Sequence, residues 1–503
     1  MKEIRPFLVI GSAVLTFLSY PPFHFGPLIF IALVPLLYAI EDLSPISAFK
    51  WGYFWGLIYY LGLVYYIAWV TIPGMIGTVT IMALLPASAF WIYIRLLDKN
   101  KSLAIVFIPA YFLAWQWLLT MSEFNYPWTD FGYSLAYMLP LIQAADIGGV
   151  YLISLFVMAV NLLVYVSISP NFDYSQRGRS YLRLSAVILI AAFFIYGEVR
   201  LSHAERVPKA EGLTVALLQA NMTRDIKWSP AYLEMNFDRY FALSREVAPQ
   251  NAQFIIWPET AIPAYLCQDP QNFARVRNLV DSLGIPLLTG VPYYDTRAPN
   301  DYIYFNSAIL LKPRVPGYTT YSKMHLVPMS ERIPYVDNLP FLRSLNLGWG
   351  DFTPGKQMTI FNLDGCHFGT LICFESVFPG FARKFACLGA QFLVVITNDM
   401  WFGRTSLFEQ HAMMSVFRAI ENRIPVVRAA NTGISLAVDK WGHILNRSDI
   451  FKEEYLVAKI YPEKSQSAYN KIGDVVPQCG LIIALLSIVV AFWRPRRYIK
   501  EAL

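Results

Sequence analysis

The chain has 503 residues, of which 56% are hydrophobic and only 15% are charged, and its formal net charge is +6. Soluble globular domains carry about 25% charged residues, so this composition excludes an ordinary soluble protein and indicates several membrane helices. The basic residues form no stripe of the kind typical of nucleic-acid binding, and no nucleic-acid partner is expected.

Apolar stretches that could cross a bilayer occupy the first 200 residues and the carboxyl-terminal region. A spanning helix needs about 20 apolar residues, and candidates lie at residues 51–70, 77–94, 103–119, 150–168, 184–196 with their flanks, and 476–493. Two shorter stretches, 7–19 and 28–40, are separated by Tyr20-Pro21-Pro22, where a helix must break. They form two spans or one re-entrant hairpin, so about eight spans are predicted. No small-residue cleavage site precedes Tyr20, and the first stretch is expected to be retained.

Lysine and arginine are distributed unequally between the two sets of connecting loops. One set, together with both termini, carries Lys2, Arg5, Lys50, Arg95, Lys99, Lys101, Arg177, Arg179, Arg183, Arg494, Arg496 and Arg497. The alternate loops, at residues 20–27, 71–74 and 122–149, contain none. Because basic loops remain in the cytoplasm, both termini are expected there and the long region before the last span is expected outside. The tail at 494–497 touches anionic headgroups or serves only as a stop-transfer anchor.

Residues 213–460 have the composition of a soluble domain in which strand-like and helix-like segments alternate. Strands are predicted at 213–220, 254–257, 286–291, 305–311, 319–324, 358–363, 368–373, 392–397, 426–429 and 434–439. Helices are predicted at 230–247, 273–283, 378–388 and 406–422. This alternation is typical of a layered α/β domain with one core. The expected organisation is a membrane helical bundle at 1–200, an exported domain at 201–465, and a membrane helix with a basic tail at 474–503.

The five cysteines leave at least one thiol unpaired, because their number is odd. An exported domain could oxidise two of Cys267, Cys366 and Cys387 to a disulfide, and the sequence leaves the pairing open. Cys479 lies in a predicted span and is expected to act as a small apolar side chain.

Three predicted strands end at reactive side chains. Glu259 follows the run FIIWP, Lys323 lies within YSKMHL, and Cys373 stands between TLI and FES. A thiol attacks a carbonyl as its thiolate, and Glu259 can be its base at neutral pH if apolar neighbours raise the carboxyl pKa. Lys323 and the backbone N–H of Phe374 would stabilise the oxyanion. The set predicts acyl transfer through a cysteine nucleophile.

Each of these residues also has an ordinary structural explanation. A cysteine that ends a strand is usually part of the core, a carboxylate after Trp-Pro often caps a turn, and a lysine on a strand is often solvated. Only the combination favours catalysis. His325 and His411 lack the ligand spacing of a zinc site, so both are expected to be structural, and no metal or other cofactor is expected.

The three motifs resemble those of the nitrilase superfamily, whose Glu-Lys-Cys triad lies on an αββα sandwich. The run TNDMWFG at 397–403 matches a further signature of these proteins, and the resemblance covers about residues 213–460. It implies that Glu259, Lys323 and Cys373 form the triad. Soluble nitrilases lack membrane helices, and with its flanking spans the whole chain resembles the apolipoprotein N-acyltransferase family.

The resemblance implies supporting roles for Trp228, Glu331, Phe374, Glu375, Asn398 and Trp401. Glu331 matches a second glutamate that orients the site, where the alternative is a solvated loop charge. Trp228 matches a tryptophan near the site, although an ordinary loop aromatic is almost as good an explanation. Relatives often place tyrosine directly after the cysteine, whereas this chain has Phe374, which keeps the backbone N–H and lacks the hydroxyl.

The family resemblance implies a two-step reaction in a bacterial inner membrane. A phospholipid donates an acyl chain to Cys373, and the α-amine of a diacylglyceryl-modified N-terminal cysteine on an apolipoprotein then takes it. The exported domain would be periplasmic and the protein a monomer. The alternative with the same triad is a membrane-tethered nitrilase-like amidohydrolase that acts on a soluble amide. A third hypothesis, a transporter or receptor, is disfavoured because the predicted spans contain almost no deep charges.

Three segments are expected to lie near the membrane surface. Residues 333–350 and 400–408 are rich in apolar and aromatic side chains and are candidates for lids or lipid-facing loops. The segment 122–149 contains six aromatic residues near its start and could form an interfacial aromatic platform. Plain packing between helices explains this last segment equally well.

Overall fold

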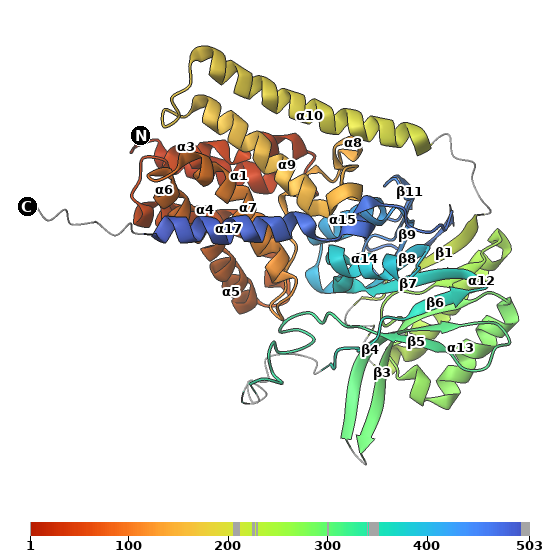
Figure 1. Ribbon diagram of the computed structural model, residues 1–503. Helices are drawn as coiled ribbons and strands as arrows, with labels where there is room; N and C mark the ends of the chain where they lie inside the picture. Colours follow the sequence, from red (N-terminus) through yellow and green to blue (C-terminus); the bar gives the residue numbers. More distant parts are fainter. Residues whose placement is uncertain are drawn as a thin grey trace, which may run out of the picture.

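The structure, a computed structural model, places a bundle of helices beside a sandwich of two β-sheets (Figure 1). It describes residues 2–204, 212–223, 227, 230–298, 301–339, 341 and 352–493. The N-terminal part of the chain builds the bundle, and the last helix, α17 (Val475–Phe492), returns to pack along α7 (Lys101–Leu119). The other bundle helices are α1 (Arg5–Leu18), α2 (Ile29–Ala32), α3 (Val34–Ile40), α4 (Pro45–Val64), α5 (Ile72–Met82), α6 (Leu84–Leu97), α8 (Leu139–Ile142), α9 (Ala145–Ile168) and α10 (Gln176–Ala204).

Five helical segments within the described residues are long and apolar enough to cross a membrane. They are Ile72–Leu97, Lys101–Leu119, Ala145–Ile168, Gln176–Ser202 and Val475–Phe492. The apolar helices Arg5–Leu18 and Gly26–Ile40 are shorter. The span predicted at 51–70 corresponds to α4, which begins at Pro45 and gives way to a 3-10 segment, Tyr65–Trp69. The described residues thus contain five helices of spanning length, and the number of about eight spans stays a prediction.

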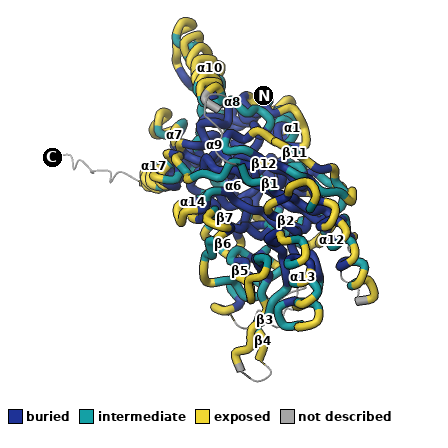
Figure 2. Tube along the Cα trace, turned by 90° about the vertical axis from the view of Figure 1, so that its right-hand side faces the viewer, coloured by how far each residue is buried: buried dark blue, intermediate teal, exposed yellow. Residues whose placement is uncertain are grey.

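Helix α10 leaves most of its apolar side chains uncovered. It packs against α9 on one side, and only 11% of its most apolar 18-residue stretch is buried within the protein. Leu184, Val187, Ile188 and Ile195 are each more than half exposed, and the helix stands out as a largely exposed ridge (Figure 2). A stripe of exposed branched aliphatic side chains of this length is stable in lipid rather than in water.

The sandwich consists of two six-stranded sheets. The first has the strand order β12-β1-β2-β3-β4-β5, with β1 (Leu213–Gln219), β2 (Phe254–Ile256), β3 (Leu287–Ala298), β4 (Asp301–Leu311), β5 (Thr319–Ser322) and β12 (Glu454–Ile460). The second has the order β11-β10-β9-β8-β7-β6, with β6 (Ile360–Leu363), β7 (Cys366–Ile372), β8 (Phe392–Thr397), β9 (Val426–Ala430), β10 (Leu436–Val438) and β11 (Ile444–Arg447). The centre of each sheet is parallel: β1 with β2 and β3 in one, and β7 with β8 and β9 in the other.

Aromatic side chains join the inner faces of the two sheets, and helices cover the outer faces. Phe254 of the first sheet contacts Phe368 and Phe392 of the second, at ring-centroid distances of 5.2 and 6.5 Å. The outer helices are α12 (Leu233–Val247) and α13 (Pro270–Leu283) on the first sheet and α14 (Pro379–Cys387) and α15 (Leu407–Asn422) on the second. All six residues of β8 are buried, as expected for a parallel strand covered on both faces.

Local signals explain where several helices begin and end. Asn100 caps α7 by accepting a hydrogen bond from the N–H of Leu103 at 3.0 Å. Asp269 does the same for α13 with the N–H groups of Gln271 and Asn272, and Gly284 ends this helix in the left-handed region at φ +67°.

A buried polar network fastens the bundle to the sandwich through α15. Arg423, at the end of α15, donates to Asp146 on α9 at 2.8 Å and to the Gln143 side chain at 2.8 Å. Arg200 of α10 reaches the same Asp146 carboxylate at 2.7 Å. Asp146 is 2% exposed and Arg423 3% exposed, so each charge depends on the other for compensation.

We expect Asp146→Ala to lower the free energy of unfolding by about 3–5 kcal/mol, because it leaves the buried Arg423 without its counter-charge. Thermal or urea unfolding of the detergent-solubilised protein measures the change. A matched control is Glu234→Ala, which removes an exposed ion pair with Arg275 and should leave the unfolding transition nearly unchanged. Equal stability of the Asp146 variant and the unmodified protein would contradict the role of this network.

Candidate active site

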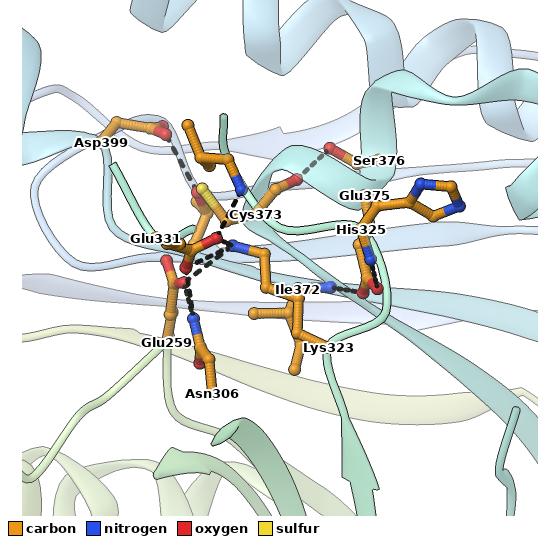
Figure 3. Close-up of polar contacts among 12 residues, drawn as sticks. Glu259, Asn306, Lys323, His325, Glu331, Ile372, Cys373, Glu375, Ser376 and Asp399 are labelled. Atoms are coloured by element: carbon orange, nitrogen blue, oxygen red, sulfur yellow. Dashed lines mark hydrogen bonds and ion pairs between the residues drawn. The ribbon is translucent and has the colours of Figure 1, made fainter. Parts of the chain in front are cut away.

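The three reactive side chains converge where the two sheets meet, at the ends of their strands. Glu259 lies three residues beyond β2, Lys323 follows β5 directly, and Cys373 follows β7 directly. Figure 3 shows the Lys323 amine between the carboxylates of Glu259 and Glu331, with the thiol of Cys373 on the same side. The sequence motifs that predicted the triad are thus brought together by pairing within two different sheets.

The turn that carries Glu259 is pressed against β3. The N–H of Gly290 donates to the carbonyl of Pro258 at 3.2 Å, and the N–H of Ala261 donates to the carbonyl of Gly290 at 3.1 Å. A Cβ atom at position 290 would lie 2.6 Å from the Cα atom of Glu259, so only glycine permits this approach. Glycine at position 290 therefore helps to set where the carboxylate of Glu259 points.

The Glu259 carboxyl is buried and hydrogen-bonded. It accepts from the Asn306 side chain at 2.7 Å, and its residue is 7% exposed. Burial raises the pKa of Glu259, and the nearby Lys323 charge only partly opposes this. A carboxylate with a raised pKa can take a proton from a nucleophile and return it within one catalytic cycle.

Lys323 is a buried cation held by two acidic groups. Its Nζ atom lies 2.8 Å from the Glu331 carboxylate and 3.6 Å from Oε1 of Glu259, and the residue is 1% exposed. Burial alone would lower the pKa of Lys323, but the charges of Glu331 and Glu259 outweigh it and raise the pKa above its usual value. The amine therefore remains a fixed positive charge that can stabilise an oxyanion.

Cys373 occupies a strained turn between β7 and the short 3-10 helix Cys373–Val377. Its φ of +53° lies in the left-handed region, which is unfavourable for a residue with a side chain, and the residue is partly exposed. Burial and the Glu259 charge raise the pKa of the Cys373 thiol, with Lys323 opposing them. The resting thiol therefore keeps its proton, and attack on a carbonyl requires a nearby base, for which the Glu259 carboxylate is the candidate.

Glu331, for which the sequence predicts an orienting role, lies beside Lys323 rather than in solvent. Besides its contact with Lys323, it accepts from the Asn306 side chain at 3.0 Å and from the N–H of Val327 at 2.8 Å. Asn306 thus bridges Glu259 and Glu331, and the three side chains fix the direction of the Lys323 amine. A single asparagine on a strand carries no sequence signal for such a role, which is why the sequence analysis missed it.

Glu375 ties the ends of β5 and β7 together instead of facing the thiol. Its carboxyl accepts from the Tyr321 hydroxyl at 2.7 Å and from the backbone N–H groups of Met324 and Ile372 at 2.7 and 2.8 Å. Burial raises the pKa of Glu375 to about 7, although these hydrogen bonds oppose the shift. The neighbouring Phe374 ring packs edge-on against Phe378. Glu375 thereby holds the backbone at the residues next to Lys323 and Cys373.

The other expected site residues have different placements. Asn398 is 5% exposed and accepts from the Asn431 side chain at 3.0 Å, which also donates to the carbonyl of Met222. Trp401 belongs to the 3-10 helix Asp399–Phe402 beside the site. Trp228 lies outside the described residues. Its neighbour Lys227, not singled out from the sequence, is fully buried and donates to the carbonyl of Glu259 at 3.0 Å, and burial lowers its pKa to about 7.

Loops around the site rest on the helical bundle. Phe402 contacts Tyr66 at a ring-centroid distance of 5.8 Å. The loop that carries Glu331 is held by Tyr335, whose N–H donates to the Glu123 carboxylate at 2.6 Å. In the segment expected to form an aromatic platform, Trp128 is 4% exposed and Phe124 56% exposed. Interior packing therefore explains Trp128, and Phe124 is left at the surface.

Comparison with known proteins identifies two matching family models. The carbon-nitrogen hydrolase model matches residues 214–470, and the apolipoprotein N-acyltransferase N-terminal domain model matches residues 12–163. An apolipoprotein N-acyltransferase of Geobacter metallireducens is 34% identical, with 97% of this chain and 95% of the relative covered. One from Chlorobaculum tepidum is 30% identical, with 96% and 95% covered. Among solved structures, an amidase from Nesterenkonia sp. is similar at 20% identity and a TM-score of 0.39, with 54% of this chain and 97% of that chain covered.

Proposed function

This chain belongs to the apolipoprotein N-acyltransferase family, and from that premise we propose that it moves an acyl chain from a phospholipid to the N-terminal cysteine of an apolipoprotein. The observation that carries the proposal is the convergence of Glu259, Lys323 and Cys373 in a domain whose loops are fastened to membrane helices. The reaction is an acyl transfer in two steps, through a thioester on Cys373.

In the first step the Cys373 sulfur attacks the ester carbonyl of the phospholipid while Glu259 takes the thiol proton. The negative charge that develops on the carbonyl oxygen is stabilised by the Lys323 ammonium and the backbone N–H of Phe374. When the C–O bond breaks, Glu259 returns the proton to the glycerol oxygen. The products are a lysophospholipid and the thioester.

In the second step the α-amine of the lipidated cysteine attacks the thioester. Glu259 takes a proton from the amine, the C–S bond breaks, and the Cys373 sulfur regains a proton. The same oxyanion donors act again because the thioester carbonyl occupies the same place. The site thus needs one base and one charged donor for both steps.

The proposed reaction explains why the catalytic domain is attached to membrane helices. Each CH₂ group removed from the bilayer costs about 0.8 kcal/mol, so two acylated substrates must react at the membrane surface. Exposed apolar side chains near the site fit this location, among them Met329 and Phe341 on the loop after Lys323 and Trp69 beside Gly403. Residues 340 and 342–350 of the expected lid lie outside the described residues, whereas Met400 within 400–408 is buried.

The proposed location is the inner membrane of a bacterium, with the sandwich on the periplasmic side, both termini in the cytoplasm, and the protein acting as a monomer. The support for this orientation is the loop asymmetry, since the loops on the proposed outer side contain no lysine or arginine at 20–27, 71–74 and 122–149.

We expect the purified protein, when incubated with phospholipid vesicles and no acceptor, to gain the mass of one acyl chain and to release lysophospholipid. Intact-protein mass spectrometry measures the adduct, and treatment with neutral hydroxylamine should remove it, because hydroxylamine cleaves thioesters. A protein that stays unmodified by phospholipid but hydrolyses a soluble amide would instead support the amidohydrolase alternative.

A further inference from the structure

The carbonyl oxygen of Cys373 is contacted by two polar side chains. The Ser376 hydroxyl donates to it at 2.8 Å, and Nε2 of His411 lies 3.2 Å from it. Ser376 and His411 also contact each other at 2.9 Å. Ser376, His411 and the residues behind them are buried, so water does not compete for these contacts.

Behind His411 stand a carboxylate and a guanidinium. Its Nδ1 atom lies 3.0 Å from Oδ1 of Asp399 and 3.1 Å from Nη2 of Arg428, and Arg428 donates to the other oxygen of Asp399 at 2.6 Å. Burial alone would raise the pKa of Asp399, but Arg428 and His411 outweigh it and hold the pKa well below its usual range. The Asp399 carboxylate is therefore ionised. Arg428, Asp399, His411 and Ser376 form one hydrogen-bonded network that ends at the peptide group between Cys373 and Phe374.

The position of the single hydrogen on the His411 ring decides which of these side chains can donate to the Cys373 carbonyl. Burial and the Arg428 charge lower the pKa of His411, so its ring is neutral and carries one N–H. With that hydrogen on Nε2, His411 and Ser376 both donate toward the Cys373 carbonyl, and Nδ1 accepts from Arg428, whose charge also compensates the Asp399 carboxylate 3.0 Å from Nδ1. With the hydrogen on Nδ1, His411 donates to the Asp399 carboxylate instead, and Ser376 is the one side chain of the pair that can donate to the carbonyl.

The carbonyl of Cys373 and the N–H of Phe374 belong to one planar peptide group and point in opposite directions. Donors that grip the carbonyl therefore fix the direction of the N–H, and they also polarise it, because hydrogen bonds in a chain strengthen one another. The N–H of Phe374 lies in the first turn of the 3-10 helix, where N–H groups have no partner within the helix, and it is the oxyanion donor of the proposed mechanism.

We infer that Ser376 and His411, backed by Asp399 and Arg428, are positioning residues that aim the Phe374 N–H at the oxyanion. The inference rests on the proposed function, since it assigns these residues to the oxyanion of that acyl transfer. The φ of Cys373 lies in the unfavourable left-handed region, and a residue keeps such a backbone conformation only when its surroundings hold it. The hydrogen bonds from Ser376 and His411 to its carbonyl provide that restraint. The ring of Trp128, 5.3 Å from that of His411, covers the imidazole from the bundle side.

Two reactions of the Cys373 sulfur distinguish a loss of oxyanion positioning from a general disruption of the site. Acylation by phospholipid builds an oxyanion, whereas alkylation of the thiol by iodoacetamide displaces iodide and builds none. We expect His411→Ala to lower the rate of thioester formation about 10- to 100-fold, mainly in kcat, as expected for a weakened oxyanion donor. Alkylation of Cys373, followed by mass spectrometry of its peptide, should change less than about threefold. His411→Gln restores a side-chain N–H near the position of Nε2 and should recover part of the loss.

The control is His443→Ala, which changes a half-exposed histidine of the same domain and should leave both rates unchanged. If His411→Ala is not recovered from membranes, Ser376→Ala, which removes one oxygen atom, is used instead, and its acylation and alkylation rates are compared in the same way. Equal losses of acylation and alkylation, or unchanged acylation, would overturn the positioning role. A failure of the unmodified protein to acylate, with normal alkylation, would refute the proposed function itself.

Discussion

Cys373→Ala is expected to eliminate the acyl adduct and to lower acyl transfer to a lipidated peptide by at least about 10⁴-fold, because the two-step path has no other nucleophile. The side chain that replaces it also carries a Cβ, so the strained φ of +53° costs the variant no more than it costs the native residue. The loss should therefore appear without a loss of stability. Mass spectrometry after exposure to phospholipid measures the adduct, and thermal unfolding measures the stability.

The chain supplies a matched control for this experiment. Cys387 is also a free cysteine of the sandwich, and it is exposed at the end of α14. Cys387→Ala should retain both the adduct and the transfer activity. An acyl adduct that persists in Cys373→Ala, or one that disappears in Cys387→Ala, would show that Cys373 is not the nucleophile.

Glu259→Gln is expected to slow thioester formation about 10²- to 10⁴-fold at neutral pH, the contribution usual for a general base. The amide has nearly the same shape as the carboxyl and can still accept from Asn306, so the change removes the base while it preserves the packing. Because the resting thiol of Cys373 keeps its proton, the variant has no other way to form the thiolate efficiently.

The pH dependence follows from the same carboxyl group. Glu259 acts as a base only when it is ionised, so acylation by the unmodified protein should fall as the pH drops through the Glu259 pKa. Burial raises that pKa, which places the acid limb above the range of an ordinary carboxyl. Glu259→Gln should remove this limb, whereas Glu246→Gln, at an exposed position of α12, should keep both the rate and the limb. A normal rate in Glu259→Gln would exclude Glu259 as the base.

Within the sandwich, the sequence predicted an apolar strand and a long helix accurately. The strand predicted at 392–397 matches β8, and the helix predicted at 406–422 matches α15 within one residue. Strands β11 and β12 were missed, because β11 is only four residues long and has no buried residue, and β12 gains its partner only by pairing with the distant β1. The strand predicted at 368–373 ends one residue earlier, where Cys373 must turn the backbone.

The amino-acid sequence alone is enough to predict the membrane character, the family and the candidate triad, because apolar length, loop charge and strand-end motifs are local patterns. How the candidate triad is supported depends on the tertiary structure. Asn306 bridges two carboxylates from a strand between them, and His411 reaches the Cys373 carbonyl from α15. Such contacts join residues far apart in the chain, and their hydrogen bonds depend on distances of a few tenths of an ångström that no linear pattern encodes.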